Sequence, residues 1–224
     1  MGDAIGQMLP SAVGIAISPI PIVAVVLMLV TPRGHSNGPA FALGWFAGIV
    51  ILGSIIVLFA SGADASDDSG PATWVSWLQL LLGVLLILLT VRQWGGRHRD
   101  GEDIETPKWM SSLDSFSPFK SLGMAVALSS INPKNLLLIV AGATSIAQTG
   151  IPIEQLELTV LIFALIASIG VVAPVGLYFV LGEKAGPLLE NLKEWLIRNN
   201  PVIMAIILLI LGVKLIGDAI SGLS

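Results

Sequence analysis

Long apolar runs separated by short polar segments are the most regular feature of the chain. A helix needs about 20 mostly apolar residues to cross the ~30 Å of hydrocarbon in a bilayer. The segments between the runs hold glycine and proline, which favour turns; they are Thr31-Pro32-Arg33-Gly34, Gly70-Pro71, Gly150-Ile151-Pro152, Gly186-Pro187 and Asn200-Pro201. The pattern predicts six transmembrane helices, at about residues 5–30, 39–61, 74–93, 121–147, 157–181 and 201–222.

The composition favours a membrane protein and narrows the chemistry. Hydrophobic residues make up 54% of the chain and charged residues only 12%, whereas roughly a quarter of a soluble domain is charged. No basic stripe lies on a solvated segment, so nucleic-acid binding is not expected. Cysteine is absent, which excludes disulfides and thiolate metal sites, and no nucleotide-binding or hydrolase motif occurs. We expect no enzymatic activity, no cofactor and no metal.

Lys and Arg are distributed unevenly between the two sides of the predicted helices. Nine of the 11 follow odd-numbered helices, and they are Arg33, Arg92, Arg97, Arg99, Lys108, Lys120, Lys184, Lys193 and Arg198. The opposite loops carry acids, namely Asp64, Asp67, Asp68, Glu154 and Glu157. Because loops rich in Lys and Arg stay in the cytoplasm, we predict that both termini lie outside it.

Two halves of the chain share a pattern. At an offset of 114 residues, Ser18-Pro19 aligns with Asn132-Pro133. The first half would start outside the cytoplasm and the second inside it, as in the inverted repeats of many secondary transporters. The sequence thus predicts an all-α integral membrane protein of two inverted three-helix repeats, residues 1–93 and 121–224, joined by a cytoplasmic loop at 94–120.

The strongest polar motif is Ser129-Ser130-Ile131-Asn132-Pro133-Lys134-Asn135, in the fourth predicted helix. A lysine at the bilayer centre costs about 2.5–3.5 kcal/mol, so it is expected to be paired or functional. Lys134 lies ~20 Å from the predicted helix start at 121, at 1.5 Å per residue, which favours an interior position. The alternative is a shorter helix that begins near residue 128, from which the side chain would reach the cytoplasmic surface.

Lys214 and Asp218 stand four residues apart in the last predicted helix and therefore share one face. They form either an ion pair near the outer end of the helix or a pair that couples transport to protons or to the substrate. With Glu154 and Glu157 counted in a loop, no acid lies within the first five predicted helices, so Asp218 is the better coupling candidate. Glu183 is a weaker one, because its neighbour Lys184 indicates a solvated helix end.

The intramembrane charges also indicate a class of substrate. Lys134, and Lys214 if it shares the site, would favour an anionic group, with Ser and Asn as hydrogen-bond donors. The N-terminal ends of helices interrupted by proline would add positive potential. Lipids that carry a sulfate, phosphate or carboxylate, and small organic anions, fit such a site, whereas basic amino acids and metal cations do not.

Three further patterns are expected to have structural roles. Residues 187–199 place leucines and Trp195 on one helical face, as in a helix lying among lipid headgroups, with a gate or docking helix as the alternative. Gly44 and Gly48 permit close helix approach, either within the subunit or across a homodimer. Four tryptophans near predicted helix ends are expected to be interface anchors; they are Trp45, Trp74, Trp77 and Trp94.

The two proline motifs also carry a family resemblance. Asn132-Pro133-Lys134 in the fourth of six predicted helices, with Ser18-Pro19-Ile20-Pro21-Ile22 in the first, resembles the LysE superfamily of exporters. Its branch most similar to this chain is the GAP family, the peptidoglycolipid- and sulfolipid-addressing proteins. The resemblance implies that the protein moves a cell-envelope lipid or another amphiphile across the inner membrane. It gives functional weight to Ser18, Pro19, Pro21, Asn132, Pro133, Lys134 and Asn135, and the motif itself adds Ser130 as a candidate.

Three functions remain open from the sequence. The first is export of an anionic envelope lipid by alternating access around Lys134. The second is export of a small solute, such as an amino acid or organic anion, by the same architecture. The third is a scaffold that assists an envelope-lipid synthase or exporter, for which the loop segments around 95–120 and 186–199 would matter more than Lys134.

Overall fold

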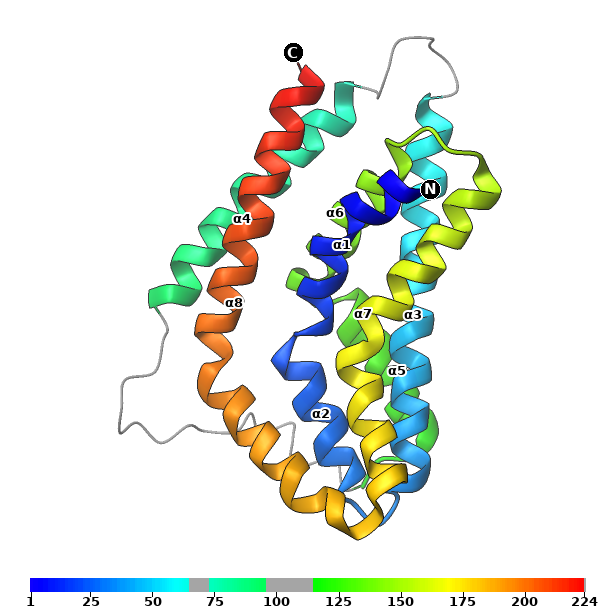
Figure 1. Cartoon of the computed structure of the whole chain (residues 1–224), viewed down its shortest axis with the longest axis vertical. Helices are drawn as coiled ribbons and strands as arrows, with labels where there is room; N and C mark the ends of the chain where they lie inside the picture. Colours follow the sequence, from blue (N-terminus) through cyan, green and yellow to red (C-terminus); the bar gives the residue numbers. More distant parts are fainter. Residues whose placement is uncertain (65–72, 96–114, 224) are drawn as a thin grey trace.

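Helices are the only regular elements in the part of the protein that the structure describes. A computed structural model describes residues 1–64, 73–95 and 115–223. The elements are α1 (Gly2–Ala16), α2 (Pro19–Leu29), α3 (Gly34–Asp64), α4 (Thr73–Gly95), α5 (Pro118–Ser130), α6 (Pro133–Ala147), α7 (Ile153–Leu181), the 3₁₀ turn η2 (Gly182–Lys184) and α8 (Ala185–Leu223) (Figure 1). The predicted all-α class is confirmed for these residues. Several loop charges lie outside them, namely Asp67, Asp68, Arg97, Arg99 and Lys108.

Four helices are long and apolar enough to cross a membrane alone. They are α7, α8, residues 34–61 of α3 and residues 76–95 of α4. The bent pairs α1–α2 and α5–α6 meet the same criterion when each pair is taken together, with bends of 49° and 65°. The chain is therefore a multi-pass membrane protein, and the count reaches six where each bent pair is one crossing.

Both bends occur at the proline motifs singled out in the sequence. Pro19 and Pro133 are the first residues of α2 and α6, a helix position at which the missing backbone N–H is not needed. The preceding residues, Ser18 and Asn132, are extended, with ψ of 113° and 118°, because a following proline disfavours helical backbone. Each motif thus ends one helix and begins the next inside an apolar run.

The last helix differs from its prediction. α8 has 39 residues and contains Pro201, so the predicted turns at Gly186-Pro187 and Asn200-Pro201 are wrong. The physical reason is a continuous apolar side, on which Leu196 before the proline and Leu208 after it are both buried. The actual turn is at Gly182, whose φ of +57° suits glycine because it has no Cβ.

The helices form a body and a separate pair. α1, α2, α3, α5, α6 and α7 make up the body, in which α3 packs along α5, and α1 packs on both α6 and α7. The remaining two helices, α4 and α8, pack mainly along each other and lean to one side of the body (Figure 1). We call these two helices the α4–α8 pair. Its contact with the body is limited and runs chiefly through α2 and α8.

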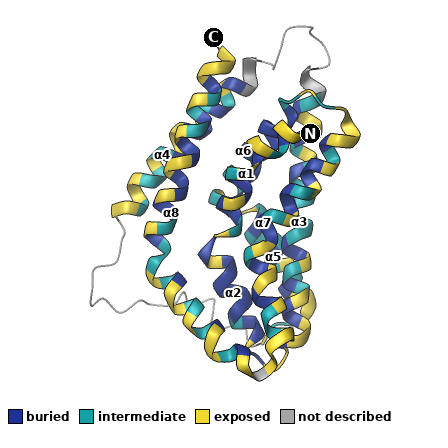
Figure 2. Cartoon of the chain, in the orientation of Figure 1, coloured by how far each residue is buried: buried dark blue, intermediate teal, exposed yellow. Residues whose placement is uncertain are grey.

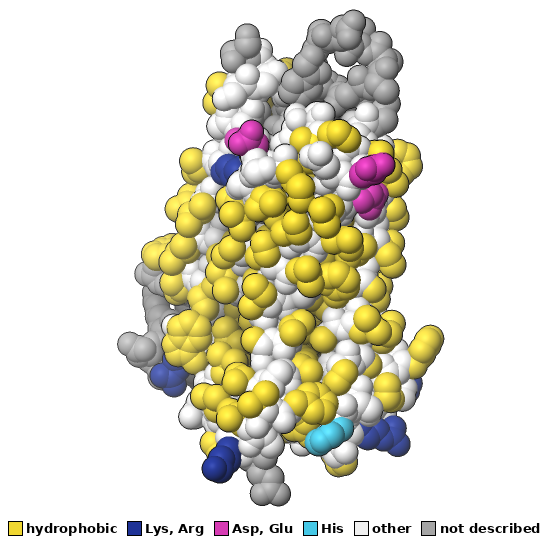
Figure 3. Space-filling model, turned by 45° about the vertical axis from the view of Figure 1, so that its right-hand side comes forward, with side chains coloured by type: hydrophobic (Ala, Val, Ile, Leu, Met, Phe, Trp, Pro, Cys, Tyr) yellow, Lys and Arg dark blue, Asp and Glu magenta, His cyan; other side chains and the backbone are white. Residues whose placement is uncertain are grey.

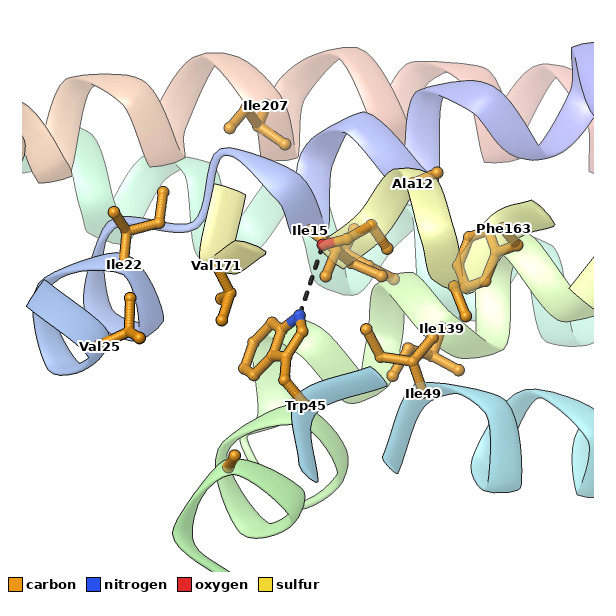
Figure 4. Close-up of a cluster of buried hydrophobic side chains, with 14 of the residues drawn as sticks. Ala12, Ile15, Ile22, Val25, Trp45, Ile49, Ile139, Phe163, Val171 and Ile207 are labelled. Atoms are coloured by element: carbon orange, nitrogen blue, oxygen red, sulfur yellow. Dashed lines mark hydrogen bonds between the residues drawn. The ribbon is translucent and has the colours of Figure 1, made fainter. Parts of the chain in front are cut away.

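Two glycines let α3 approach α5 within the same chain. A Cβ on Gly44 would lie 2.3 Å from the Leu122 carbonyl oxygen, and one on Gly48 would lie 2.2 Å from Ser129 Oγ. The predicted close contact is therefore intramolecular. The same packing buries Trp45 completely, and its Nε1 donates to the Ala167 carbonyl oxygen at 3.4 Å (Figure 4). The prediction of Trp45 as an interface anchor is wrong, because its indole fills the centre of the body instead.

The outer surface fits a lipid environment. Large apolar side chains are exposed along α3, α4, α7 and α8, whereas buried residues face the inside of the bundle (Figure 2). On the face drawn in Figure 3, hydrophobic side chains form a broad band, with Asp and Glu towards one end and most Lys and Arg at the other. This separation of charge follows the pattern found in the sequence.

Candidate functional site

The two helix breaks bring their polar residues into contact. Lys134 Nζ donates to Ser18 Oγ at 2.5 Å, and Ser18 Oγ donates to Asn135 Oδ1 at 3.2 Å. Ser18 and Asn135 are buried, and Lys134 is half-buried. The two motifs that align in the sequence therefore meet in space, although they are more than 110 residues apart.

Lys134 is the second residue of α6, directly after the break. The predicted depth of Lys134 in the membrane assumes one uninterrupted helix that starts at residue 121. The structure instead has a helix from Pro118 to Ser130 followed by a bend. Its ammonium is directed at the hydroxyl of the other break. The ion pairs found among the described residues are Lys193–Glu190 and Lys214–Asp218, so within this part of the chain Lys134 has no carboxylate partner.

A cavity of about 110 Å³ adjoins the Lys134 side chain; we call it the Lys134 cavity. It is lined by Ser18, Pro19, Ile20, Pro21, Gln93, Asn132, Lys134, Asn135, Asn200 and Met204. Water occupies about 30 Å³ per molecule in the liquid, so the space holds a few waters or one small charged group. It is too small for a whole lipid headgroup with a sugar.

The electrostatics of the Lys134 cavity favour an anion. None of the described residues that line it is acidic. Ser18 and Asn132, the N-cap residues of α2 and α6, both line it, and the N-terminal end of a helix carries roughly half a positive charge. The ammonium of Lys134 and the N-terminal ends of α2 and α6 therefore make the electrostatic potential in this cavity positive, as expected for helices interrupted by proline.

Two lining residues were not identified from the sequence. Asn200 comes from α8 and Gln93 from α4, so the α4–α8 pair supplies one wall of the cavity. Asn200 Oδ1 is buried and has no hydrogen-bond partner among the described residues, which leaves an acceptor available for a small donor such as water. The sequence placed Asn200 in a turn, and no local pattern shows which helices become neighbours.

Two other residues of the motif at 129–135, Asn135 and Ser130, donate hydrogen bonds to backbone carbonyl oxygens. Asn135 Nδ2 donates to the Leu128 carbonyl oxygen at 3.0 Å, so this side chain also satisfies a carbonyl freed by the end of α5. Ser130 does not line the cavity. Its Oγ donates to the Gly48 carbonyl oxygen at 3.4 Å, which places it in the contact between α3 and α5.

Lys214 and Asp218 lie in a different cavity. Lys214 Nζ donates to Asp218 Oδ2 at 2.5 Å, and both side chains are partly exposed. They line a wide, open cavity of about 670 Å³ together with Asp3, Gln7 and Gln148; we call it the outer cavity. It shares no lining residue with the Lys134 cavity, so the structure does not bring the two lysines together.

One acid of a candidate membrane-crossing helix was missed by counting it in a loop. α7 begins at Ile153, which places Glu157 in the second turn of the helix. Ser54 Oγ of α3 donates to Glu157 Oε2 at 3.0 Å, in a partly buried contact. The statement that no acid lies in the first five crossings is therefore wrong.

Among the described residues, no three His, Asp or Glu side chains come together as metal ligands would.

Comparison with known proteins agrees with the resemblance carried by the proline motifs. No curated protein and no solved structure matches the chain. The family described as "Sap, sulfolipid-1-addressing protein" matches residues 8–221, from the middle of α1 to the end of α8. The match thus includes both helix breaks and the whole lining of the Lys134 cavity. On this evidence the chain belongs to the sulfolipid-1-addressing protein family.

Proposed function

We propose that this protein exports an anionic cell-envelope lipid, or an amphiphile like it, across the bacterial inner membrane, as a transporter and not as an enzyme. The observation that carries the proposal is Lys134, an ammonium beside two helix N-termini in a cavity whose lining residues include no acid. Burying a charge is costly unless it is paired. A sulfate, phosphate or carboxylate of a substrate would supply the missing negative charge.

Family membership supports a role with envelope lipid, since the family description names a sulfolipid. We further propose that the chain is an exporter of the LysE type, because its two proline motifs resemble those of that superfamily. The sulfate of a sulfolipid is a small tetrahedral anion of the kind that a cavity of about 110 Å³ can receive. The remainder of such a lipid would have to lie outside this cavity.

The route that we infer follows the seam between the α4–α8 pair and the body. The Lys134 cavity and the outer cavity each have one wall on α8 and another on the body. Rocking of the pair against the body would open one cavity while closing the other, as in transporters built from inverted repeats. We take the repeats to be residues 1–93 and 121–224, each of which starts with a bent helix pair that has proline at the break.

The decisive experiment compares inner-membrane and outer-envelope lipids in a strain that lacks the gene. The strain is complemented with the wild-type protein, with Lys134→Ala or with Lys120→Ala. Lys120 is an exposed lysine in the first turn of α5, at the other end of this helix from the break, and so serves as a control lysine outside the cavity. We expect an acidic lipid to accumulate in the inner membrane, and Lys120→Ala but not Lys134→Ala to restore its export. All variants must reach the membrane at equal abundance.

Full complementation by Lys134→Ala would contradict the proposal. In that case a scaffold that assists another envelope-lipid exporter becomes the better description. No change in any lipid on deletion would also contradict it, and would favour export of a small solute.

A further inference from the structure

A third cavity, of about 410 Å³, lies between α8 and the body; we call it the apolar cavity. Its lining includes Ile17 and Ile22 at the α1–α2 break, Ala173 of α7, and Trp195 and Ile203 of α8. No lining residue carries a polar or charged group other than the indole N–H of Trp195. Binding of a charged group at Lys134 does not require such an apolar space, and neither does the contact between α8 and the body.

The apolar cavity and the Lys134 cavity are built on the same two segments. Residues 18–21 of the α1–α2 break line the Lys134 cavity, and Ile17 and Ile22 on either side of them line the apolar one. On α8, Asn200 lines the former, and Leu196 and Ile203 line the latter. A polar and an apolar compartment therefore adjoin each other across one helix break.

Glycine at position 170 brings the walls of the apolar cavity together. A Cβ there would lie only 1.7 Å from the Ala16 carbonyl oxygen, so α7 touches the end of α1 at a distance that no other residue permits. Gly170 and Ala16 both line the apolar cavity, so this contact holds the end of α1 against α7 at the edge of the space.

We propose that the apolar cavity binds a hydrocarbon chain of the same anionic amphiphile whose charged group is bound at Lys134. This inference rests on the proposed function and narrows it, because a small soluble substrate would have no use for the second compartment. An amphiphile carries an anionic end and an apolar end within one molecule, which matches the two adjoining linings. The volume of about 410 Å³ is within the usual range of ligand sites, about 300–1,000 Å³.

The charged end must supply the selectivity. In a bilayer the surrounding lipid tails are as apolar as the cavity lining, so a chain gains little simply by leaving the membrane for the cavity. A chain is held there preferentially only when it is attached to a group that Lys134 binds. Occupancy of the apolar cavity by the amphiphile is therefore expected to depend on Lys134.

Photolabelling of the full chain in phosphatidylcholine nanodiscs tests this dependence. One probe is an alkyl sulfate with a diazirine near the end of its chain, and a second is a short alkyl sulfate with the diazirine beside the sulfate. A neutral alkyl glycoside with a chain-end diazirine serves as the uncharged comparison. Labelled residues are located by mass spectrometry in the wild type, Lys134→Ala, Ala173→Phe and Val172→Phe. Val172 neighbours Ala173 but lines none of the three cavities.

We expect the chain-end sulfate probe to label residues that line the apolar cavity. Ala173→Phe should reduce that labelling roughly tenfold by filling the space, and Val172→Phe should not. Lys134→Ala should reduce it by a similar factor, because the charged hydrogen bonds that anchor the probe are lost. Labelling by the sulfate-end probe near Lys134 should survive Ala173→Phe.

The other outcomes separate this inference from the proposed function. Equal labelling of the apolar cavity by the neutral probe, unaffected by Lys134→Ala, would mean that ordinary membrane lipid fills it and would overturn the inference. Chain-end labelling elsewhere, with Lys134-dependent labelling by the sulfate-end probe, would overturn the inference and leave the proposed function standing. Failure of both sulfate probes to label in a Lys134-dependent way would overturn both.

Discussion

The ammonium of Lys134 lies 2.5 Å from the hydroxyl of Ser18, which belongs to the other helix break. This contact is one of those that join the first bent pair to the second, because Ser18 is the N-cap residue of α2 and Lys134 is the second residue of α6. The same serine hydroxyl also meets Asn135. Ser18 is therefore both part of the candidate anion site and a tie between the two halves of the chain.

Replacing Ser18 with Ala should destabilise the protein and weaken export. A hydrogen bond to a charged group contributes about 1.5–3 kcal/mol, so we expect a loss of that order in the free energy of unfolding in detergent micelles. Ser36→Ala is the control, because Ser36 is exposed and its Oγ bonds only the nearby Arg33 carbonyl oxygen. Equal unfolding free energies for the two variants would show that the Lys134 contact does not stabilise the fold.

Replacing Asn200 with Leu should separate function from stability. The buried Asn200 Oδ1 has no partner among the described residues, and removing an unsatisfied buried acceptor is neutral or stabilising. We therefore expect an unchanged or higher melting temperature together with reduced lipid export, since a polar side chain of the cavity lining is lost. Asn199→Ala provides the comparison: its side chain donates to the Trp195 carbonyl oxygen at 2.8 Å and does not line the Lys134 cavity. Normal export by Asn200→Leu would exclude a role for Asn200 in substrate binding.

A methyl group on Gly44 should disrupt the contact between α3 and α5. The new Cβ would lie 2.3 Å from the Leu122 carbonyl oxygen, and overpacking of this kind costs about 1–3 kcal/mol. Gly44→Ala should therefore lower the melting temperature in detergent. Gly123→Ala on α5 has no atom within 4 Å of the new Cβ and should leave stability unchanged or raise it, because alanine favours helix. An unchanged melting temperature for Gly44→Ala would contradict a close contact between α3 and α5 at this residue.

The Lys214–Asp218 pair should contribute little to stability and should not be needed for export. The side chains are 24% and 36% exposed, and ion pairs in such positions contribute about 0.2–1 kcal/mol. A double-mutant cycle with Lys214→Ala and Asp218→Ala is expected to give a coupling energy below about 1 kcal/mol. Asp218→Asn should still export lipid, since the pair lies apart from the Lys134 cavity. Loss of export with normal folding would instead make Asp218 the proton-coupling group.

Both termini are expected outside the cytoplasm. The chain has no cysteine, so single cysteines at exposed positions report sidedness directly. Ser221→Cys near the C-terminus should react with a membrane-impermeant maleimide in intact cells. Ser36→Cys, at the basic end of α3, should react only after the cells are permeabilised. The reverse pattern would invert the orientation inferred from the loop charges.

The sequence indicated the positions of the two helix breaks better than it indicated the ends of the last helix. Pro19 and Pro133 act locally on the preceding residue, so the breaks at Ser18 and Asn132 could be expected from the chain alone. The sequence could not show whether Pro201 ends a helix or lies inside one. Proline usually breaks or kinks a helix, so only packing on both sides explains why α8 continues through it. Trp45 was misassigned for a similar reason: hydropathy places a residue along a crossing but does not say whether it faces lipid or the body.

The contributions of the α4–α8 pair lay beyond sequence reasoning altogether. Asn200 and Gln93 reach the Lys134 cavity only because α8 and α4 lean over the α1–α2 break. Their neighbours in the chain give no sign of this, since one follows an amphipathic segment and the other ends an apolar run. Contacts between helices that are distant in the sequence cannot be inferred from the spacing of apolar residues within one helix.

The length of α8 has a mechanical consequence. At 1.5 Å per residue its 39 residues extend ~58 Å, nearly twice the ~30 Å of bilayer hydrocarbon. The same continuous helix that lines the Lys134 and apolar cavities is therefore longer than one straight crossing of the lipid tails requires. Because residues 187–199 and Asn200 belong to this one helix, we expect a protein or headgroup that binds the exposed side of residues 187–199 to shift Asn200 as well.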